Sequence, residues 1–248
     1  MSSEMFQDEA IILRVRNWQT ADKYAVCFCR EHGKIPFVAY GAAYPRSQSG
    51  RLVQPFAHLQ VTLAPGRKVA TLRSCESLEM PQPPDWENLA YGAIIGEVAE
   101  NLLGEEEPQE EVFQLLLEAF RLLGKRNKRL VTDSTLLKLL SLCGLNPILD
   151  VCTSCNEPVT EDGYFSLVQG GFLCRKCAMG DELPFTLPTR DLMEQLLHLD
   201  LNEPPDFTVR GRELMSLEKI LYQFILYQTD RPIRSLEFLA QMEKTAHG

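Results

Sequence analysis

The stretch CTSCNEPVTEDGYFSLVQGGFLCRKC, residues 152–177, contains two Cys-x-x-Cys pairs separated by 18 residues. Each pair can place two thiolates along one edge of a tetrahedron. The segment between the pairs predicts a hairpin, with strands at 164–168 and 172–173 around a turn at 169–171. Such a hairpin would return the second pair to the first, so the spacing predicts a four-cysteine metal site.

Zinc fits this cysteine arrangement better than two alternatives. A thioredoxin-type redox motif has a single pair beside a βαβ unit, whereas this chain has two pairs and no such pattern. Iron–sulfur ligation stays open as an alternative, although paired knuckles with hairpin spacing favour zinc. One structural Zn²⁺ would be held by Cys152, Cys155, Cys174 and Cys177, which leave no position for water. The ion would stabilise a loop between helices that is too small for its own core.

The bulk composition indicates a cytoplasmic protein. The first ten residues are polar and acidic and lack the basic and apolar regions of a signal peptide. No apolar run approaches ~18 residues, so no membrane span is expected. Thiols stay reduced in the cytoplasm, so the eight cysteines are expected to be ligands or core residues. Core positions are predicted for the four outside the pairs, namely Cys27, Cys29, Cys75 and Cys143.

The net charge of −9 conceals an uneven distribution along the chain. Residues 1–80 carry ten Lys and Arg against seven Asp and Glu, whereas residues 81–248 carry fifteen against twenty-seven. A mildly basic first part and an acidic second part suggest two domains with different partners.

Apolar, β-rich runs, two of them alternating, predict five short strands in the first part of the chain. The predicted strands occupy 9–16, 22–34, 35–41, 56–66 and 68–80, and the longest irregular connection precedes the fourth. Strands at ~10-residue spacing, joined by Gly and Pro turns, are typical of a small barrel such as the OB-fold.

Helical periodicity dominates after the proline-rich segment at 81–85. Helices are predicted at 85–104, 110–124, 130–144, 188–199, 210–228 and 234–242. The predicted fold is therefore α+β and multidomain, with an OB barrel followed by a helical domain that carries the inserted zinc knuckle. The expected boundaries are 1–80 for the barrel, 81–150 and 183–248 for the two helical parts, and 151–182 for the knuckle.

The sequence offers little that an enzyme would need. Motifs for dinucleotides, P-loop phosphates, a serine nucleophile elbow and a zinc protease are missing. The four histidines lie outside any motif and are expected to be structural or exposed: His32, His58, His198 and His247. We therefore expect no catalytic residues and no organic cofactor.

The order of these parts resembles the RecO family of bacterial recombination mediators. The resemblance is carried by the segments EAIILRVRNWQTADKYAVCFCREHGKIPFVAYGA, LVQPFAHLQVTL, LLKLLSLCGLNPILDVCTSC and YFSLVQGGFLCRKC. It implies a nucleoid-associated, non-enzymatic protein that binds single- and double-stranded DNA and anneals complementary strands. It also implies contacts with RecR and with the C-terminal tail of single-stranded DNA-binding protein, and an indirect role in loading RecA.

An OB surface binds nucleic acid through cations that contact phosphates and through rings that stack on bases. Tyr40 is as consistent with the barrel core as with stacking. The loop after Gly41 keeps only two cations, so we expect modest affinity that falls steeply with salt. The predicted DNA contacts are Arg14, Arg16, Lys34, Arg46, Arg51, Arg67, Lys68, Arg73 and Tyr44.

A basic segment between two predicted helices could bind an acidic, apolar-ended peptide. This site would consist of Arg121, Lys125, Arg126, Lys128 and Arg129, with the helix at 210–228 as a neighbouring groove. A solvated turn and ordinary core packing are the alternatives. For the whole protein, two alternatives to a DNA-binding mediator stay open. They are a zinc-stabilised scaffold with little DNA affinity and an RNA-binding OB protein.

Overall fold

The computed structural model describes residues 4–81 and 85–246, and the side chains of residues 243, 245 and 246 are not described. Residues 82–84 of the predicted linker, and His247, lie outside this part. The chain divides into two compact units, Met1–Lys128 with Arg234–Gly248, and Arg129–Ile233. Each unit is described by itself, and the four-part division made from the sequence stays a prediction.

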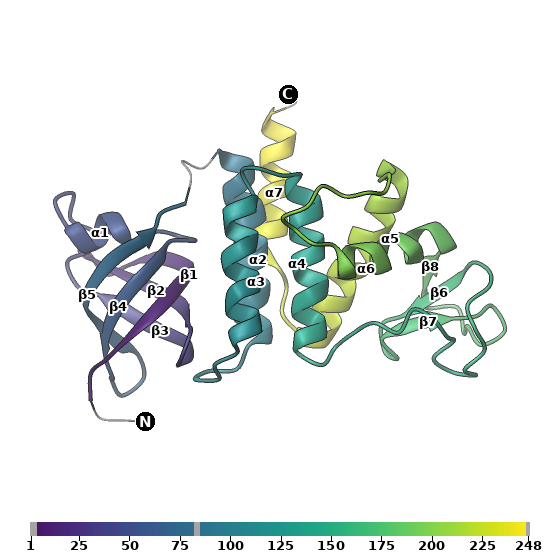
Figure 1. The fold of residues 1–248 in the computed structure, drawn as a ribbon, viewed down its shortest axis with the longest axis horizontal. Coiled ribbons are helices and arrows are strands. Elements are labelled where there is room, and N and C mark those ends of the chain that lie inside the picture. Colours follow the sequence, from purple (N-terminus) through teal and green to yellow (C-terminus); the bar gives the residue numbers. More distant parts are fainter. Residues whose placement is uncertain (1–3, 82–84, 247–248) are drawn as a thin grey trace. The chain divides into compact units, whose positions relative to one another are not determined.

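The first unit begins with a closed five-stranded barrel (Figure 1). Its strands are β1 (Phe6–Trp18), β2 (Asp22–Cys29), β3 (Gly33–Ala39), β4 (His58–Ala64) and β5 (Ala70–Glu79). The order around the barrel is β1-β2-β3-β5-β4, and β4 pairs back onto β1. All pairs are antiparallel except β3 with β5. The predicted OB barrel is confirmed.

Strand alternation separates the inside of the barrel from its outside. Ala25, Cys27 and Cys29 on β2 belong to the interior apolar cluster. Val26 and Phe28 alternate with them and are also buried, although they lie outside that cluster. Both faces of β2 are therefore apolar because one fills the barrel and the other is covered from outside.

A short helix, α1 (Gln48–Leu52), lies in the connection between β3 and β4 that was predicted to be irregular. Its first turn is capped by Ser47, whose side chain accepts a hydrogen bond from the Gly50 N–H at 3.1 Å. The prediction missed this helix because five residues are too short to show a helical period.

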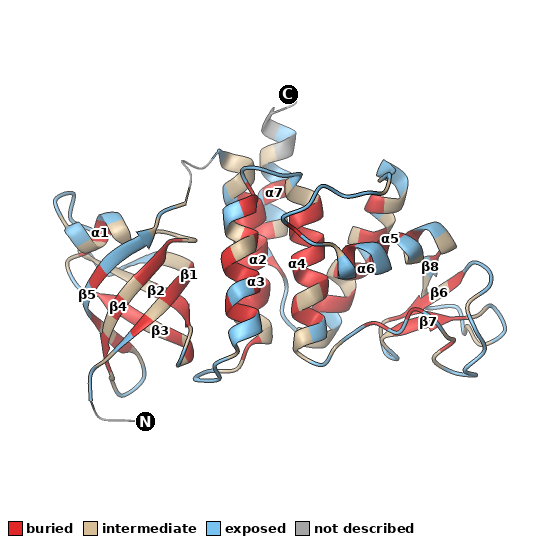
Figure 2. Ribbon diagram, in the orientation of Figure 1, coloured by how far each residue is buried: buried red, intermediate tan, exposed pale blue. Residues whose placement is uncertain are grey.

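Three longer helices complete the first unit: α2 (Trp86–Leu102), α3 (Glu110–Leu122) and α7 (Arg234–Ala246). Helix α2 packs on β1 through Gly96, where a Cβ would lie only 2.5 Å from the Leu13 carbonyl oxygen. The same helix holds the start of α7, because the Glu97 carboxylate accepts hydrogen bonds from the Arg234 and Ser235 N–H groups at 3.0 and 2.8 Å. Helix α3 is buried along one side, whereas α2 is buried around most of its circumference (Figure 2).

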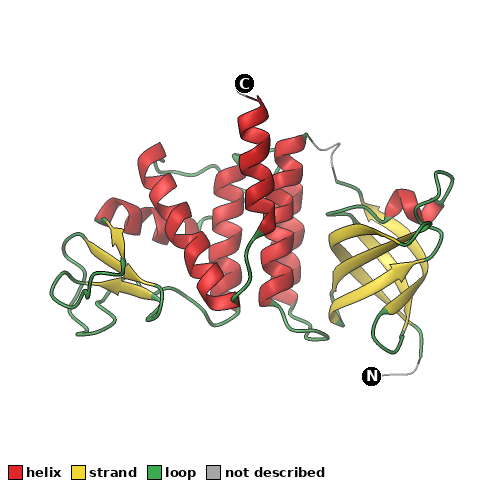
Figure 3. Ribbon diagram, turned by 180° about the vertical axis from the view of Figure 1, so that it is seen from behind, coloured by secondary structure: helices red, strands yellow, loops and turns green. Residues whose placement is uncertain are grey.

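The second unit combines helices with a small sheet (Figure 3). Its helices are α4 (Lys128–Leu142), which starts at the end of the first unit, α5 (Leu187–His198) and α6 (Gly211–Thr229). Its sheet has the order β7-β6-β8, formed by β6 (Gly163–Ser166), β7 (Gly171–Leu173) and β8 (Leu183–Phe185). The hairpin of β6 and β7 agrees with the predicted one, whereas β8 was not predicted. None of the described helices combines the length and the apolar content that crossing a bilayer requires.

Helix α4 carries a buried acid. Asp133 is fully buried, and one of its carboxylate oxygens has no hydrogen-bond partner within the described residues. The other oxygen accepts a bond from the Tyr222 hydroxyl at 3.3 Å. Burial, with a further contribution from the negative charge of Glu218, raises the pKa of Asp133 well above its usual value.

This pKa predicts a stability that depends on pH. Because the folded-state pKa is raised, the stabilising contribution of protonated Asp133 is complete below the unfolded pKa and is lost as pH rises through the folded pKa. Asp133→Asn keeps the shape of the side chain without its charge, so we expect its free energy of unfolding to exceed that of the parent by about 1–3 kcal/mol at pH 8. Urea denaturation should show this difference shrinking toward pH 5. Asp206→Asn, at an exposed position, is the control, and an Asp133→Asn effect that is constant with pH would contradict the expectation.

Candidate metal centre and nucleic-acid interface

The segment before β6 folds into a knuckle that is tied to β7. The Ile148 N–H donates to the Gly170 carbonyl at 3.0 Å, and the Phe172 N–H donates to the Ile148 carbonyl at 2.9 Å. Gly171 lies at this crossing, where a Cβ would be 2.5 Å from the Ile148 oxygen. Asn156 ends the first Cys-x-x-Cys turn with a φ of 61°, a left-handed conformation that asparagine tolerates.

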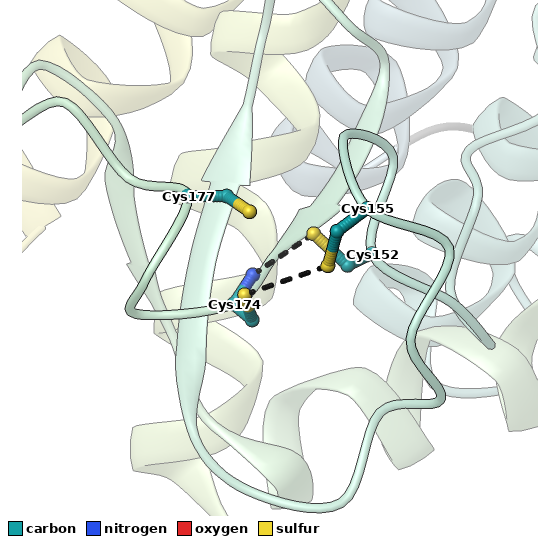
Figure 4. Close-up of side chains that lie close together, drawn as sticks. All are labelled: Cys152, Cys155, Cys174 and Cys177. Atoms are coloured by element: carbon teal, nitrogen blue, oxygen red, sulfur yellow. Dashed lines mark hydrogen bonds between the residues drawn. The ribbon is translucent and has the colours of Figure 1, made fainter.

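The four predicted ligands converge on one point (Figure 4). Their sulfur atoms all lie within 4.8 Å of one another, and those of Cys155 and Cys174 are 3.9 Å apart. Four thiolates around a tetrahedral zinc, each ~2.3 Å from the ion, would be ~3.8 Å apart. Cys152 is buried, Cys174 and Cys177 are half-buried, and Cys155 is exposed. The donor set and its geometry therefore fit a single metal ion.

The backbone around Cys152 favours its thiolate form. Burial alone would raise the pKa of Cys152, but hydrogen bonds from the N–H groups of Cys174, Cys155 and Ser154 outweigh it and lower the pKa to about 6. In contrast, hydrogen bonds to the sulfur atoms of Cys174 and Cys155 raise the pKa of Cys177 to about 12. Four thiolates at this separation repel one another, so a bound cation would be needed to hold them all deprotonated.

Cysteines outside the knuckle behave largely as predicted. Cys27, Cys29 and Cys75 are buried in the barrel core. Cys143, expected in a core, is only half-buried near the end of α4.

Two predicted DNA contacts are instead held by α2. The Arg14 guanidinium donates two hydrogen bonds to the Glu100 carboxylate, each 2.7 Å long. The Lys34 ammonium donates to the carbonyl oxygens of Glu100 and Leu103, at 2.7 and 2.5 Å. Both side chains thus help fix α2 against the barrel, which leaves them poorly placed to neutralise phosphates.

The other predicted DNA contacts are exposed. No ion pair is formed within the described chain by Arg16, Arg46, Arg51, Arg67, Lys68 or Arg73. The structure does not gather these cations at one place. Arg67 and Lys68 lie in the β4–β5 turn, and Lys68 shares a cleft with His32 of the β2–β3 turn. Arg16, Tyr44 and Arg46 lie instead toward the end of the barrel formed by the β1–β2 hairpin.

Trp18, the last residue of β1, is a candidate contact that the sequence analysis missed. Its side chain is exposed, and the Arg16 guanidinium lies 4.9 Å from its ring centroid and 4.5 Å from that of Tyr24. Tyr40, left open between core and surface, is exposed. The segment RVRNW contains the signal, because Arg16 and Trp18 are two residues apart and share one face of a strand.

The residues predicted to bind a partner peptide have different contacts, each described within its own unit. Arg121 and Lys125 line a shallow groove with the apolar side chains of Phe56, Leu117 and Phe120, although Arg121 also pairs with Glu79 at 2.5 Å. Arg126 is exposed in the turn after α3. Lys128 pairs with Glu87, and Arg129 makes two 2.7 Å hydrogen bonds with Glu218. The apolar side of α6, considered as a neighbouring groove, is buried, as core packing requires.

Two histidines have structural contacts. His32 hydrogen-bonds Asp8 at 2.7 Å and stacks on Phe6. His58 is buried, contacts Glu9 at 3.3 Å and meets the edge of Phe113. Burial lowers the pKa of His58, against the opposing effect of Glu9, so this side chain favours its neutral form.

The barrel order, the following helices and the four-cysteine knuckle define an OB-fold protein with an insertion whose cysteines could hold a metal ion. Residues 1–81 match the family described as "Recombination protein O N terminal", and residues 83–237 match "Recombination protein O C terminal". The chain is 34% identical to "DNA repair protein RecO" of Symbiobacterium thermophilum, over 95% of this chain and 96% of the relative. It is 32% identical to the protein of that name from Desulforudis audaxviator, over 96% and 98%.

The chain belongs to the RecO family, and its role lies in DNA repair and recombination.

Proposed function

We propose that this protein is a non-enzymatic recombination mediator that binds single- and double-stranded DNA and anneals complementary strands. The observation that carries this proposal is a closed OB barrel whose hairpin end presents exposed rings and, beside Trp18, the guanidinium of Arg16, which forms no ion pair within the described residues. Annealing requires only that two strands be held close with their phosphates partly neutralised, which such a surface can do without bond-making chemistry. The protein would act in the cytoplasm, associated with the nucleoid.

We further propose that the metal is one structural Zn²⁺ held by the four cysteines of the knuckle. Four sulfur ligands at tetrahedral spacing are characteristic of structural zinc sites. The ion would cross-link the two cysteine pairs of the knuckle. The four thiolates would fill its coordination positions, so none would be open to a substrate.

The protein partners proposed are RecR, the tail of single-stranded DNA-binding protein, and RecA through the assembly it helps to load. The groove with Arg121 and Lys125 supports a tail contact, because it combines basic groups with apolar walls. An alternative function is a scaffold with little DNA affinity. The use of Arg14 and Lys34 in holding α2 favours that alternative, since it removes two cations from the DNA-binding set.

The deciding experiment measures annealing of complementary oligonucleotides at ~50 and ~200 mM salt, with and without single-stranded DNA-binding protein. The mediator should anneal strongly at the lower salt and weakly at the higher. Folded, metal-loaded protein that neither anneals nor retains DNA at low salt would favour the scaffold. Matched DNA and RNA oligomers at one salt concentration test for an RNA-binding role.

Charge reversal tests the loop before and within α1. Arg46→Glu with Arg51→Glu removes two exposed cations and adds two acids, so we expect annealing at ~50 mM salt to fall by about tenfold or more. Arg210→Glu with Arg212→Glu, at exposed positions in the second unit, makes the same change in net charge. Equal annealing by the two variants would show that net charge, and not this loop, determines binding.

A further inference from the structure

The end of the barrel at the β1–β2 hairpin exposes three large aromatic side chains. Trp18 at the end of β1 is 37% exposed, Tyr40 directly after β3 is 67% exposed, and Tyr44 before α1 is 64% exposed. Soluble proteins usually bury such rings or use them for contacts. Their grouping at one end of the barrel therefore calls for a ligand.

Strand register and backbone hydrogen bonds hold these rings near one another. Trp18 lies opposite Asp22 on β2, and the neighbouring Lys23 lies opposite Ala39 on β3. The backbones of Trp18 and Tyr40 are therefore about two strand spacings, roughly 10 Å, apart. Asp22 accepts a hydrogen bond from the Gly41 N–H at 2.8 Å. The Ala43 N–H donates to the Ala21 carbonyl at 2.8 Å, which fixes the loop of Tyr44 against the hairpin.

Arg16 supplies a cation that the rings hold in place. Its guanidinium lies over both Trp18 and Tyr24, whose ring centroids are 5.7 Å apart. Arg16 is exposed and forms no carboxylate pair within the part of the chain that the structure describes. Arg14, two residues earlier, is bound to Glu100. Arg16, which lies against the exposed Trp18 ring, is thus oriented by stacking while the residue stays exposed to solvent.

Rings and a free guanidinium at this spacing match the chemistry of an unpaired nucleic-acid strand. A single strand presents base faces and phosphates in alternation, and base–ring stacking is sequence-tolerant because every base has a π-face. A duplex hides those faces within its stack, so it would use only the cation. Asp22, the acidic residue that lies opposite Trp18 on β2, already accepts a hydrogen bond from the Gly41 N–H.

We propose that Arg16, Trp18, Tyr40 and Tyr44 form a base-stacking site, the hairpin platform, that recognises single-stranded DNA. Trp18 is the ring that stacks on a base, and Arg16 contacts an adjacent phosphate. The inference rests on the proposed DNA-binding function and deepens it, because it assigns the recognition of single strands to these four side chains.

Intrinsic fluorescence reports stacking directly because the chain has only two tryptophans, Trp18 and Trp86. In a Trp86→Phe variant, an oligothymidylate of about 16 nucleotides should quench the emission of Trp18. An oligomer of abasic sites of equal length should bind through its phosphates with little quenching. The reciprocal Trp18→Phe variant, which leaves only Trp86 on α2, should show no comparable quenching.

Affinity measured with labelled oligonucleotides gives the second readout. Trp18→Ala should weaken single-strand binding by about tenfold, leave duplex binding little changed, and be largely rescued by Trp18→Phe. The urea midpoint checks that the alanine variant is folded. DNA binding without quenching of Trp18, unchanged single-strand affinity of Trp18→Ala, or an equal loss for both DNA forms would overturn the platform and leave the proposed function standing. No binding of either DNA form by the metal-loaded parent at ~50 mM salt would overturn both.

Discussion

Cys174→Ser is expected to abolish metal binding and to lower the free energy of unfolding of the second unit by more than about 4 kcal/mol. Cys174 follows β7 directly, and its sulfur is 3.9 Å from that of Cys155. Its N–H also donates to the Cys152 sulfur at 3.4 Å, so the residue links both halves of the knuckle. With three thiolates the site could no longer hold the ion in a complete tetrahedron, so the segment at 148–159 would lose its metal cross-link and keep only its backbone hydrogen bonds to β7.

Metal analysis and hydrogen exchange would measure these two effects together. The parent protein should contain one zinc per chain, and the variant almost none, with faster exchange through β6 and β7. Cys143→Ser, which changes a cysteine outside the cluster, should keep the metal. Freshly purified parent protein without zinc would refute the zinc assignment, and iron with inorganic sulfide in its place would identify a cluster instead.

Gly96→Leu should have the second largest effect, a loss of more than about 3 kcal/mol in the first unit. A Cβ at this position would lie 2.5 Å from the Leu13 carbonyl oxygen, and that backbone atom cannot rotate away. Helix α2 would have to lift from β1, which would also break the pairing of Arg14 with Glu100. The packing cost of the leucine side chain should exceed the stability gained from its higher helix propensity relative to glycine.

The same substitution at Gly211 provides a matched control. Gly211 begins α6, and nothing lies within 4 Å of a Cβ built there. Gly211→Leu should therefore shift the urea midpoint only slightly. Similar midpoints for the two variants would show that the contact between α2 and β1 is less tight than the structure indicates.

Local patterns in the sequence were enough to predict the barrel and the metal cluster. Apolar, β-rich runs and Gly and Pro turns marked all five barrel strands, and two of the runs also showed period-2 alternation. The two Cys-x-x-Cys pairs predicted their own convergence, since few folds besides a knuckle accommodate that spacing. In both cases the residues that form the pattern lie within a few tens of residues of one another in the sequence.

Features that depend on distant contacts were not predictable. The sequence gives no sign that Arg14 meets Glu100, 86 residues later, and so it presents Arg14 as a free cation. The strand β8 has only three residues, and its identity comes from pairing with β6. The groove near Arg121 likewise depends on the packing of α3 beside Phe56. Such contacts decide which cations remain available to a ligand.

The return of α7 to the first unit has a consequence for synthesis on the ribosome. Helix α2 is complete early in translation, but α7, whose first residues it binds through Glu97, follows only after residues 129–233 have been made. At ordinary rates of synthesis this delay lasts roughly 5 to 20 s. During that time the face of α2 that α7 later covers has no partner from its own unit, while the second unit can already fold. The first unit therefore cannot be completed until the end of translation. Until then, the uncovered face of α2 in the nascent chain would need protection from aggregation, which a chaperone could provide.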